Sequence, residues 1–135
     1  MVAGDFNDET CDRSIREVLG AVQQGAVNGV PADALYFSTA PGPGDRVGGS
    51  IKYRGRWYLF DHVFYSSGLA EMKGTGLFIP PGSVNIFMPD FLLERDRQWT
   101  GWKPLRTWMG WKYQAGFSDH LPLTADLYCR ESGAD

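Results

Sequence analysis

Long apolar segments are missing from this sequence of 135 residues, and no run approaches the roughly 20 residues that a helix needs to cross a bilayer. The first residues do not have the pattern of a signal peptide either, because no basic stretch followed by an apolar one lies near Met1, and localisation stays open. A basic stripe is also lacking, since 13 Lys and Arg are scattered among 16 Asp and Glu. Proteins that coat duplex DNA through its phosphates usually show such a stripe, so this function is disfavoured.

Cysteine is scarce, and internal repeats and low-complexity tracts are absent. Cys11 and Cys129 lie near opposite ends of the chain without metal-ligand spacing, and we expect free, partly buried thiols. Glycine (17 residues) and proline (8 residues) are plentiful by contrast, which favours a loop-rich β or mixed architecture over a helical bundle. The length allows one domain with a single core.

A strand over residues 1–4 and one helix of about three turns are predicted in the first part of the chain. The helix is indicated by apolar residues at positions i, i+3, i+4 and i+7, namely Ile15, Val18, Leu19 and Val22. Asp12 suits its N-cap, and Gly25 and Pro31 mark its far end.

Strands and loops are predicted for the rest of the chain. Residues 50–53 and 57–66 are expected to form a hairpin around Arg54-Gly55-Arg56, and Asp61 is out of place in the aromatic second strand unless something requires a carboxylate there. The other expected elements are a loop at 33–50 with a short ordered piece at 35–37, a strand at 84–87, a turn or strand at 91–94, an irregular aromatic region at 96–117 and a final strand at 118–128.

Three short segments carry polar side chains at predicted strand ends: Gly4-Asp5-Phe6-Asn7, Phe60-Asp61-His62-Val63-Phe64 and Gly116-Phe117-Ser118-Asp119-His120-Leu121-Pro122-Leu123. Asp5 and Asn7 are two residues apart, so on extended backbone they project to the same side. Asp119 and His120 are adjacent and face opposite ways, so His120 needs a carboxylate from elsewhere. Asp61 is the candidate, and such a pair fixes the imidazole tautomer and raises its basicity.

These segments, in this order, resemble the GDFN, aspartate-strand and SDHxP motifs of the endonuclease/exonuclease/phosphatase superfamily, and they span nearly the whole chain. The phrases Tyr53-Arg54-Gly55-Arg56-Trp57, Phe91-Leu92-Leu93-Glu94 and Pro104-Leu105-Arg106-Thr107-Trp108 are similar to one bacterial branch of it. The resemblance implies a deoxyribonuclease-I-like α+β fold, a four-layer α/β/β/α sandwich. Residues 1–135 would form its carboxy-terminal half as a single partial domain, with a mixed sheet, one main helix and long loops.

The resemblance also implies a metal-dependent phosphoester hydrolase, a phosphodiesterase, nuclease or phosphatase. Asp61 would orient His120, and Asp119 would ligate a divalent cation, expected to be Mg²⁺ or Mn²⁺ because the available ligands are hard oxygens. The Asp5 carboxylate can orient water or protonate the leaving group, and the Asn7 amide can hold a phosphoryl oxygen. Arg106 either clamps a substrate phosphate or forms a surface salt bridge.

Each segment also has a structural interpretation. The segment around Asp5 can form an Asx-turn with a helix cap, Asp61 can be an edge-strand charge, and residues 118–122 can be an ordinary turn. His62, which faces away from Asp61, is expected to be packed or on the surface and not a ligand. The tryptophans at 99, 102, 108 and 111 either form an aromatic platform or cover the core, and the second is favoured.

The chain lacks the asparagine, the glutamate and the second active-site histidine that the amino-terminal half of such a fold brings. Its glutamates lie in no matching context, and a single carboxylate holds a cation weakly. We therefore expect an inactive or weak enzyme that needs its missing half or self-associates through an exposed sheet face. The alternative is a catalytically silent binding module that uses the tryptophan-rich loop 98–113. The identity of the phosphoester stays open.

Overall fold

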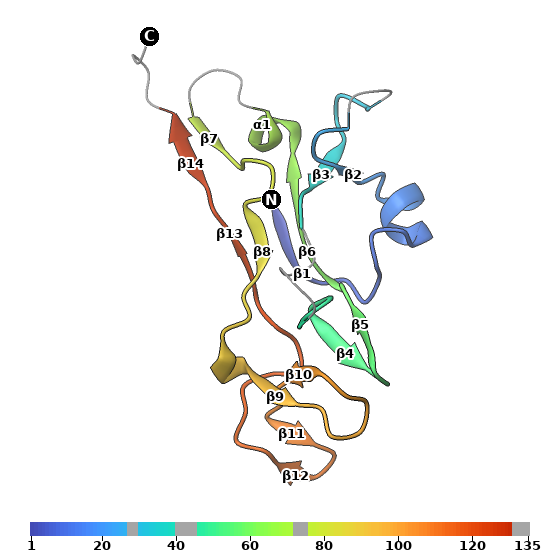
Figure 1. Cartoon of the computed structure of the whole chain (residues 1–135). Helices are drawn as coiled ribbons and strands as arrows, with labels where there is room; N and C mark the ends of the chain where they lie inside the picture. Colours follow the sequence, from blue (N-terminus) through green and yellow to red (C-terminus); the bar gives the residue numbers. More distant parts are fainter. Residues whose placement is uncertain (27–29, 40–45, 72–75, 131–135) are drawn as a thin grey trace.

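A four-stranded sheet forms the centre of the computed structural model, which describes residues 1–26, 30–39, 46–71 and 76–130. Its strands, in spatial order, are β1 (Val2–Asp5), β6 (Asp61–Ser66), β3 (Leu35–Phe37) and β2 (Val22–Gln23). β6 runs antiparallel to both β1 and β3, whereas β2 and β3 are parallel (Figure 1). The predicted first strand and the ordered piece at 35–37 are therefore confirmed.

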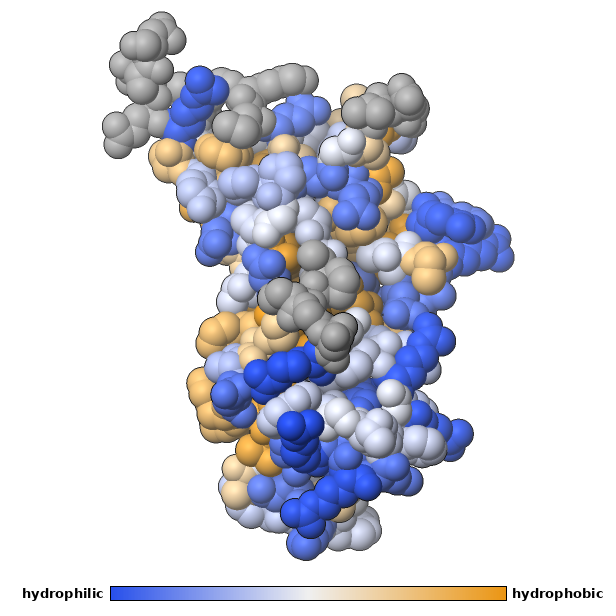
Figure 2. Space-filling model, viewed as in Figure 1, coloured by the Kyte–Doolittle hydropathy of each residue, from blue (hydrophilic) through white to orange (hydrophobic). Residues whose placement is uncertain are grey.

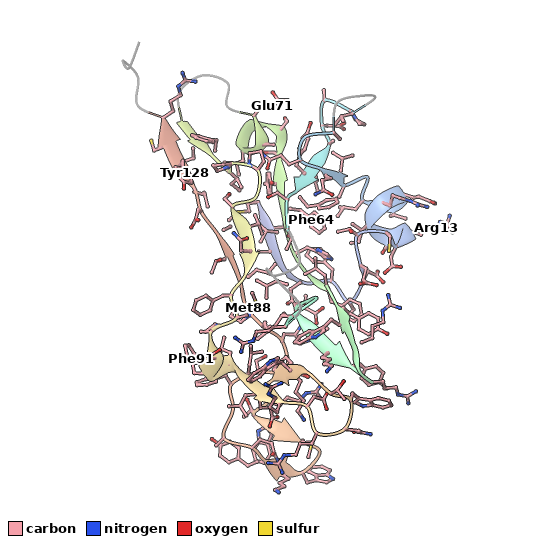
Figure 3. All side chains as sticks on the ribbon, viewed as in Figure 1. Arg13, Phe64, Glu71, Met88, Phe91 and Tyr128 are labelled. Carbon is pink, nitrogen blue, oxygen red and sulfur yellow. The ribbon has the colours of Figure 1, made fainter. Side chains whose placement is uncertain are left out.

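β6 is the buried spine of this sheet, because its side chains from His62 to Tyr65 are covered on both faces. Alternate residues on a strand point to opposite faces. Val63 and Tyr65 enter one core with Ile79 and Val84. Phe64, which Figure 3 shows inside the molecule, enters a second core on the other face. Two cores that share one strand fix the register of β6, since a slip by one residue would exchange their side chains.

The predicted three-turn helix is wrong in length, since the structure has only a π-helical turn at Ser14–Val18. The N-cap position is Arg13, not Asp12. Val18 is 79% exposed, and Gly20 adopts a φ of +65°, which ends the turn. Val22 leaves the helical pattern to pair with β3, so strand pairing prevails over local helix propensity.

The predicted hairpin is present as β4 (Ile51–Tyr53) and β5 (Arg56–Tyr58). Both central turn residues have positive φ, 49° at Arg54 and 86° at Gly55, as a tight two-residue hairpin turn requires. The expected second strand, 57–66, is interrupted, because β5 ends at Tyr58 and β6 begins at Asp61.

The remaining chain forms short strand pairs. β8 (Val84–Ile86) pairs with β13 (Leu123–Ala125), and β7 (Gly76–Phe78) pairs with β14 (Tyr128–Arg130), so the predicted strand at 84–87 is confirmed and the final strand is split in two. The region 96–117 is less irregular than expected. It holds β10 (Trp102–Pro104), which pairs with β9 (Leu93–Arg95), and the pair β11 (Trp108–Met109) and β12 (Lys112–Tyr113).

Helix is confined to single turns in the described residues: the π-helical turn, α1 (Ser67–Ala70) and the 3-10 turn η2 (Asp90–Leu92). None of them is long and apolar enough to cross a membrane. Sheet thus dominates a mixed α+β fold, which confirms the predicted class. The four-layer sandwich and the assignment of 1–135 to one half of it stay predictions.

Exposed apolar side chains gather beside η2. Phe91 contacts the rings of Phe87 and Phe117, with centroids 6.5 and 5.8 Å away, and all three are exposed. Figure 2 shows apolar surface at this margin, over η2. The cysteines are also exposed: Cys11 and Cys129 are both free, as expected, but they are not partly buried.

Candidate active site

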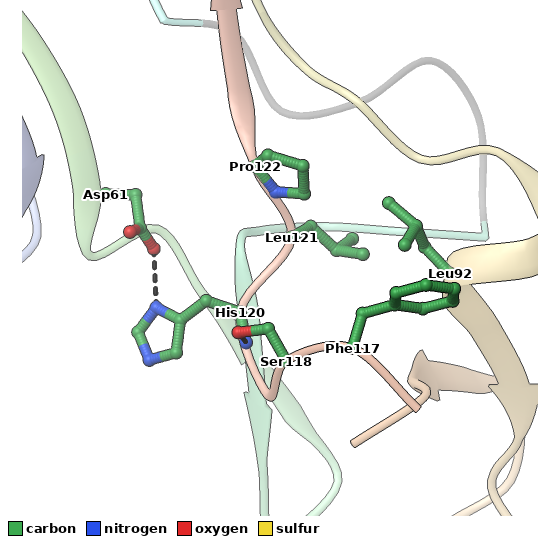
Figure 4. Close-up of a pocket in the computed structure, with 7 residues that line it drawn as sticks. All are labelled: Asp61, Leu92, Phe117, Ser118, His120, Leu121 and Pro122. Atoms are coloured by element: carbon green, nitrogen blue, oxygen red, sulfur yellow. Dashed lines mark hydrogen bonds and ion pairs between the residues drawn. The ribbon is translucent and has the colours of Figure 1, made fainter. Parts of the chain in front are cut away.

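Asp61 and His120 meet although 59 positions separate them in the chain. β6 begins at Asp61, and a single β-bridge holds His120 against Ile51 of β4. The His120 Nδ1 atom lies 2.6 Å from Asp61 Oδ2, and both side chains are largely buried, with 22% and 18% of their surfaces exposed (Figure 4). Because the carboxylate accepts, Nδ1 carries a proton, and Nε2 is the ring nitrogen on the opposite side. The pair expected from the sequence is therefore in contact, while its catalytic role stays a prediction.

Asp5 joins this pair from the neighbouring strand. It is the last residue of β1 and lies directly across from Asp61 in the antiparallel register, so both carboxylates project from the same face. Its Oδ2 atom lies 3.9 Å from His120 Nε2. The imidazole thus has one carboxylate near each ring nitrogen, and ligand atoms of all three residues lie within 4.8 Å of one another.

Asn7 reaches the site by a different route from the expected one. β1 ends at Asp5, and Asn7 adopts a left-handed φ of 55°, so the expected extended backbone is wrong. The Asn7 backbone N–H donates to Asp5 Oδ1 at 2.8 Å, which is the Asx-turn considered as the structural interpretation. The turn brings the Asn7 amide nitrogen to 3.4 Å from Asp5 Oδ2. The amide and the carboxylate are therefore neighbours after all.

His62 is a packed histidine, as expected, and it holds the loop that follows Asp5. It is fully buried, its ring lies beside those of Phe6 and Phe64, and its Nε2 atom lies 2.8 Å from the Asp8 carbonyl oxygen. A carbonyl only accepts, so Nε2 carries the proton. This bond ties the loop after β1 to β6, so His62 stabilises the site without lining it.

Asp119 lies apart from the Asp5–Asp61–His120 group. It is exposed and lines a separate depression of about 310 Å³ with Arg106. Asp61 and His120 line the adjacent depression, of about 250 Å³, and Ser118 belongs to both. The opposite orientation expected for adjacent residues on extended backbone agrees with this separation.

Arg106 makes no ion pair within the described part of the chain, so the surface salt bridge considered for it is not found there. Its Nη2 atom donates to the Lys52 carbonyl at 3.1 Å. The other guanidinium donors remain available beside Asp119, where an anion could accept from them.

The available donor atoms fit a weakly held hard cation. Mg²⁺ prefers oxygen ligands and usually keeps several waters beside one or two carboxylates and a substrate phosphate. Asp119 offers an exposed carboxylate, for which no hydrogen bond or ion pair is found among the described residues. The Asp61 carboxylate is engaged by His120, and Asp5 is engaged by the Asn7 backbone. Asp119 therefore offers an accessible oxygen ligand, while Asp5, Asp61 and His120 form the group of described side chains whose ligand atoms lie close enough together to share an ion.

Ser50 is a site residue that sequence reasoning missed. It is fully buried, and its hydroxyl accepts from the backbone N–H groups of Phe60 and Asp61, both at 3.3 Å. Its carbonyl also accepts from Leu121 N–H at 2.7 Å. Ser50 therefore links the strand that carries Asp61 to the loop that carries His120. An isolated serine before a strand gives no signal for such a role.

The tryptophans are mostly exposed, so the favoured expectation that they cover the core is wrong for three of the four. Trp99 is 47% exposed, Trp108 57% and Trp111 fully exposed. Only Trp102 packs against the core around Leu93 and Leu121.

Replacing Gly116 by Ala is expected to destabilise the loop that leads to Asp119 and His120. An added Cβ would lie 2.1 Å from the Leu105 carbonyl oxygen and 2.4 Å from that of Arg106, and backbone cannot yield as a side chain can. We expect a loss of about 1–3 kcal/mol or more in the free energy of unfolding, measured by urea denaturation. Gly68→Ala is the matched control, because its nearest atom is 3.9 Å away. Equal stability of the two variants would contradict the close approach.

Comparison with known proteins gives one match. A family model described as "Endonuclease/Exonuclease/phosphatase family" matches residues 1–128. No curated protein and no solved structure matches the chain.

Proposed function

Because this chain belongs to the endonuclease/exonuclease/phosphatase family, whose members hydrolyse phosphoesters, we propose that it is a metal-dependent phosphoester hydrolase with Asp5, Asn7, Asp61, Asp119 and His120 at its site. The observation that supports the proposal is the His120 imidazole, which lies between the carboxylates of Asp5 and Asp61, so that three segments of the chain meet at one point.

The proton chemistry is assigned to His120, Asp61 and Asp5. Asp61 holds the proton on Nδ1 of His120, which leaves Nε2 free to accept a proton from water or, once protonated, to donate to a phosphoryl oxygen. Asp5 is fixed by the Asn7 N–H and faces Nε2. It can therefore orient the attacking water or return a proton to the leaving oxygen.

Charge on the phosphoryl group is assigned to Asn7 and Asp119. The exposed Asn7 amide can donate to a phosphoryl oxygen without adding negative charge. Asp119 would hold Mg²⁺ or Mn²⁺, and a bound cation would polarise a phosphoryl oxygen and offset its charge. One carboxylate holds such an ion weakly, so we expect a low rate at ordinary cation concentrations. A partner that adds ligands, an amino-terminal half or a second copy of the chain, stays a prediction.

The proposal is tested with an aryl phosphodiester, excess Mn²⁺ and the whole chain. We expect slow, cation-dependent hydrolysis that Asp5→Ala and His120→Ala each lower by at least about a hundredfold, the usual contribution of a positioned acid or base. Asp33→Ala is the control, because Asp33 is an exposed aspartate away from the site. The proposal is contradicted if no hydrolysis is detected. It is also contradicted if the rate depends neither on the cation nor on Asp5 and His120.

The second candidate function is a catalytically silent binding module, favoured by the exposed tryptophans of loop 98–113. It predicts ligand binding that Asp5→Ala and His120→Ala leave unchanged. The same two variants thus separate the two functions.

A further inference from the structure

A second cavity, of about 320 Å³, lies between the β4–β5 turn and the loop that joins β9 to β10. The proposed hydrolysis does not use it. Its walls include the cations Lys52, Arg54, Lys103 and Arg106 and the rings of Tyr53 and Trp99.

The charge of this cavity is positive. Its one carboxylate, Asp96, is neutralised by Lys52 Nζ at 3.0 Å and by the backbone N–H groups of Gln98 and Trp99. Arg54 and Arg106 have no ion-pair partner among residues that the structure describes, and Lys103 meets Glu94 only at 3.5 Å. Neither guanidinium group is therefore neutralised by a carboxylate there: Arg106 uses one donor on the Lys52 carbonyl, Arg54 lies over the Tyr53 ring, and their remaining donors suit an anion.

The cavity also presents a flat aromatic surface. Trp99 is 47% exposed and Tyr53 54% exposed. Gly55 supports one side of the indole, since a Cβ on Gly55 would lie 3.1–3.3 Å from Trp99 atoms. A supported ring that still reaches solvent is suited to stacking against a planar group of a ligand.

The cavity continues the row of depressions that starts at the candidate active site. Phe117 and Ser118 line both the depression of His120 and that of Asp119. Arg106 lines both the depression of Asp119 and the basic cavity. A ligand that occupies the whole row has to be longer than one phosphate group.

We propose that the basic cavity binds a nucleotide unit of the substrate, a phosphate and its base, next to the phosphodiester at His120. Arg54 and Arg106 would hold the phosphate, and Trp99 would stack on the base. The inference rests on the proposed function, and it names single-stranded nucleic acid as the substrate class.

The test measures binding of a thymidine trinucleotide with phosphorothioate linkages to the whole chain by calorimetry, so that hydrolysis is not needed. We expect Arg54→Ala to weaken binding about tenfold, as for a lost charge-assisted hydrogen bond, and to reduce the slope of log affinity against log salt by about 0.7. Trp99→Ala should weaken binding about fivefold to a hundredfold without changing that slope, and Trp99→Phe should restore most of the loss.

Two control variants and a second probe complete the design. Arg13, the N-cap of the π-helical turn, has a side chain that is 84% exposed and lies far from the β4–β5 turn (Figure 3), and Trp111 is fully exposed outside the cavity. Arg13→Ala and Trp111→Ala should bind like the unaltered chain. Inorganic pyrophosphate should lose affinity in Arg54→Ala but not in Trp99→Ala. Unchanged trinucleotide binding in Arg54→Ala and Trp99→Ala, or equal losses in the controls, would overturn the inference. Failure of hydrolysis alone would instead overturn the proposed function.

Discussion

Replacing Asp61 by Asn is expected to lower the turnover of a phosphodiester by about 10³- to 10⁴-fold while the chain stays folded. The carboxylate accepts the Nδ1 proton of His120 at 2.6 Å, so in the neutral imidazole the lone pair lies on Nε2, which faces Asp5. An amide of the same shape can instead donate to Nδ1. The imidazole proton then moves to Nε2, where it blocks the lone pair that has to accept a proton.

The measurement separates this positioning role from a structural one. Because the Asp61 carboxylate is occupied by His120, kcat should fall while KM changes little. Asp61→Glu keeps a carboxylate and should recover part of the rate, whereas Asp33→Asn, an exposed control, should change neither constant. A rate for Asp61→Asn within tenfold of the unaltered chain would show that the pair has no part in the reaction.

Local signals predicted the elements that depend on local geometry. The hairpin follows from Arg54 and Gly55, whose positive φ values suit the turn, and the β6 strand follows from its aromatic and β-branched residues. The helix pattern from Ile15 to Val22 failed, because Val22 gains a parallel strand partner that lies 14 residues further along the chain. Periodicity in one segment carries no information about such a distant partner.

The sequence predicted a contact within the site only where one side chain needs another as its hydrogen-bond partner. Adjacent Asp119 and His120 cannot serve each other on extended backbone, which pointed to Asp61, and the structure brings Asp61 and His120 into contact. The position of Asn7 was not predictable, because Asn7 itself adopts a left-handed backbone conformation just after the end of β1. The buried hydroxyl of Ser50 is a second example, since its role arises only because Ser50 lies next to the backbone of Phe60 and Asp61 in the folded chain.

Replacing Asp96 by Ala is expected to cost about 3–5 kcal/mol in the free energy of unfolding, because it leaves the buried Lys52 ammonium without its carboxylate partner. Lys52 and Asp96 are each only 5% exposed in their side chains and lie 3.0 Å apart. The Lys52 ammonium also donates to the Thr100 carbonyl at 2.6 Å. The pair joins β4 to the loop that joins β9 to β10, so its loss should also distort the basic cavity.

The Lys52–Asp96 pair also determines how the stability of the fold should depend on pH. Burial alone would raise the pKa of Asp96, but hydrogen bonds from Lys52, Trp99 and Gln98 outweigh it and hold the pKa below its usual 3.8. A carboxylate with a lowered pKa in the folded state stabilises the fold fully above the unfolded pKa. This contribution to stability is lost as the pH falls through the lower pKa that Asp96 has in the folded state. The stability difference between the unaltered chain and Asp96→Ala should therefore shrink only below about pH 4.

Two further variants separate a buried charge from a general loss of packing. Glu94→Gln removes an acid whose pair with Lys103 is longer, at 3.5 Å, and partly exposed, so it should cost less than about 1 kcal/mol. Replacing both partners, as Lys52→Met with Asp96→Leu, leaves no charge uncompensated and should recover most of the loss. If the double variant is as unstable as Asp96→Ala, the cost lies in shape and the electrostatic explanation fails. If it is stable but no longer binds the trinucleotide, the pair is retained for the shape of the basic cavity and not for the fold.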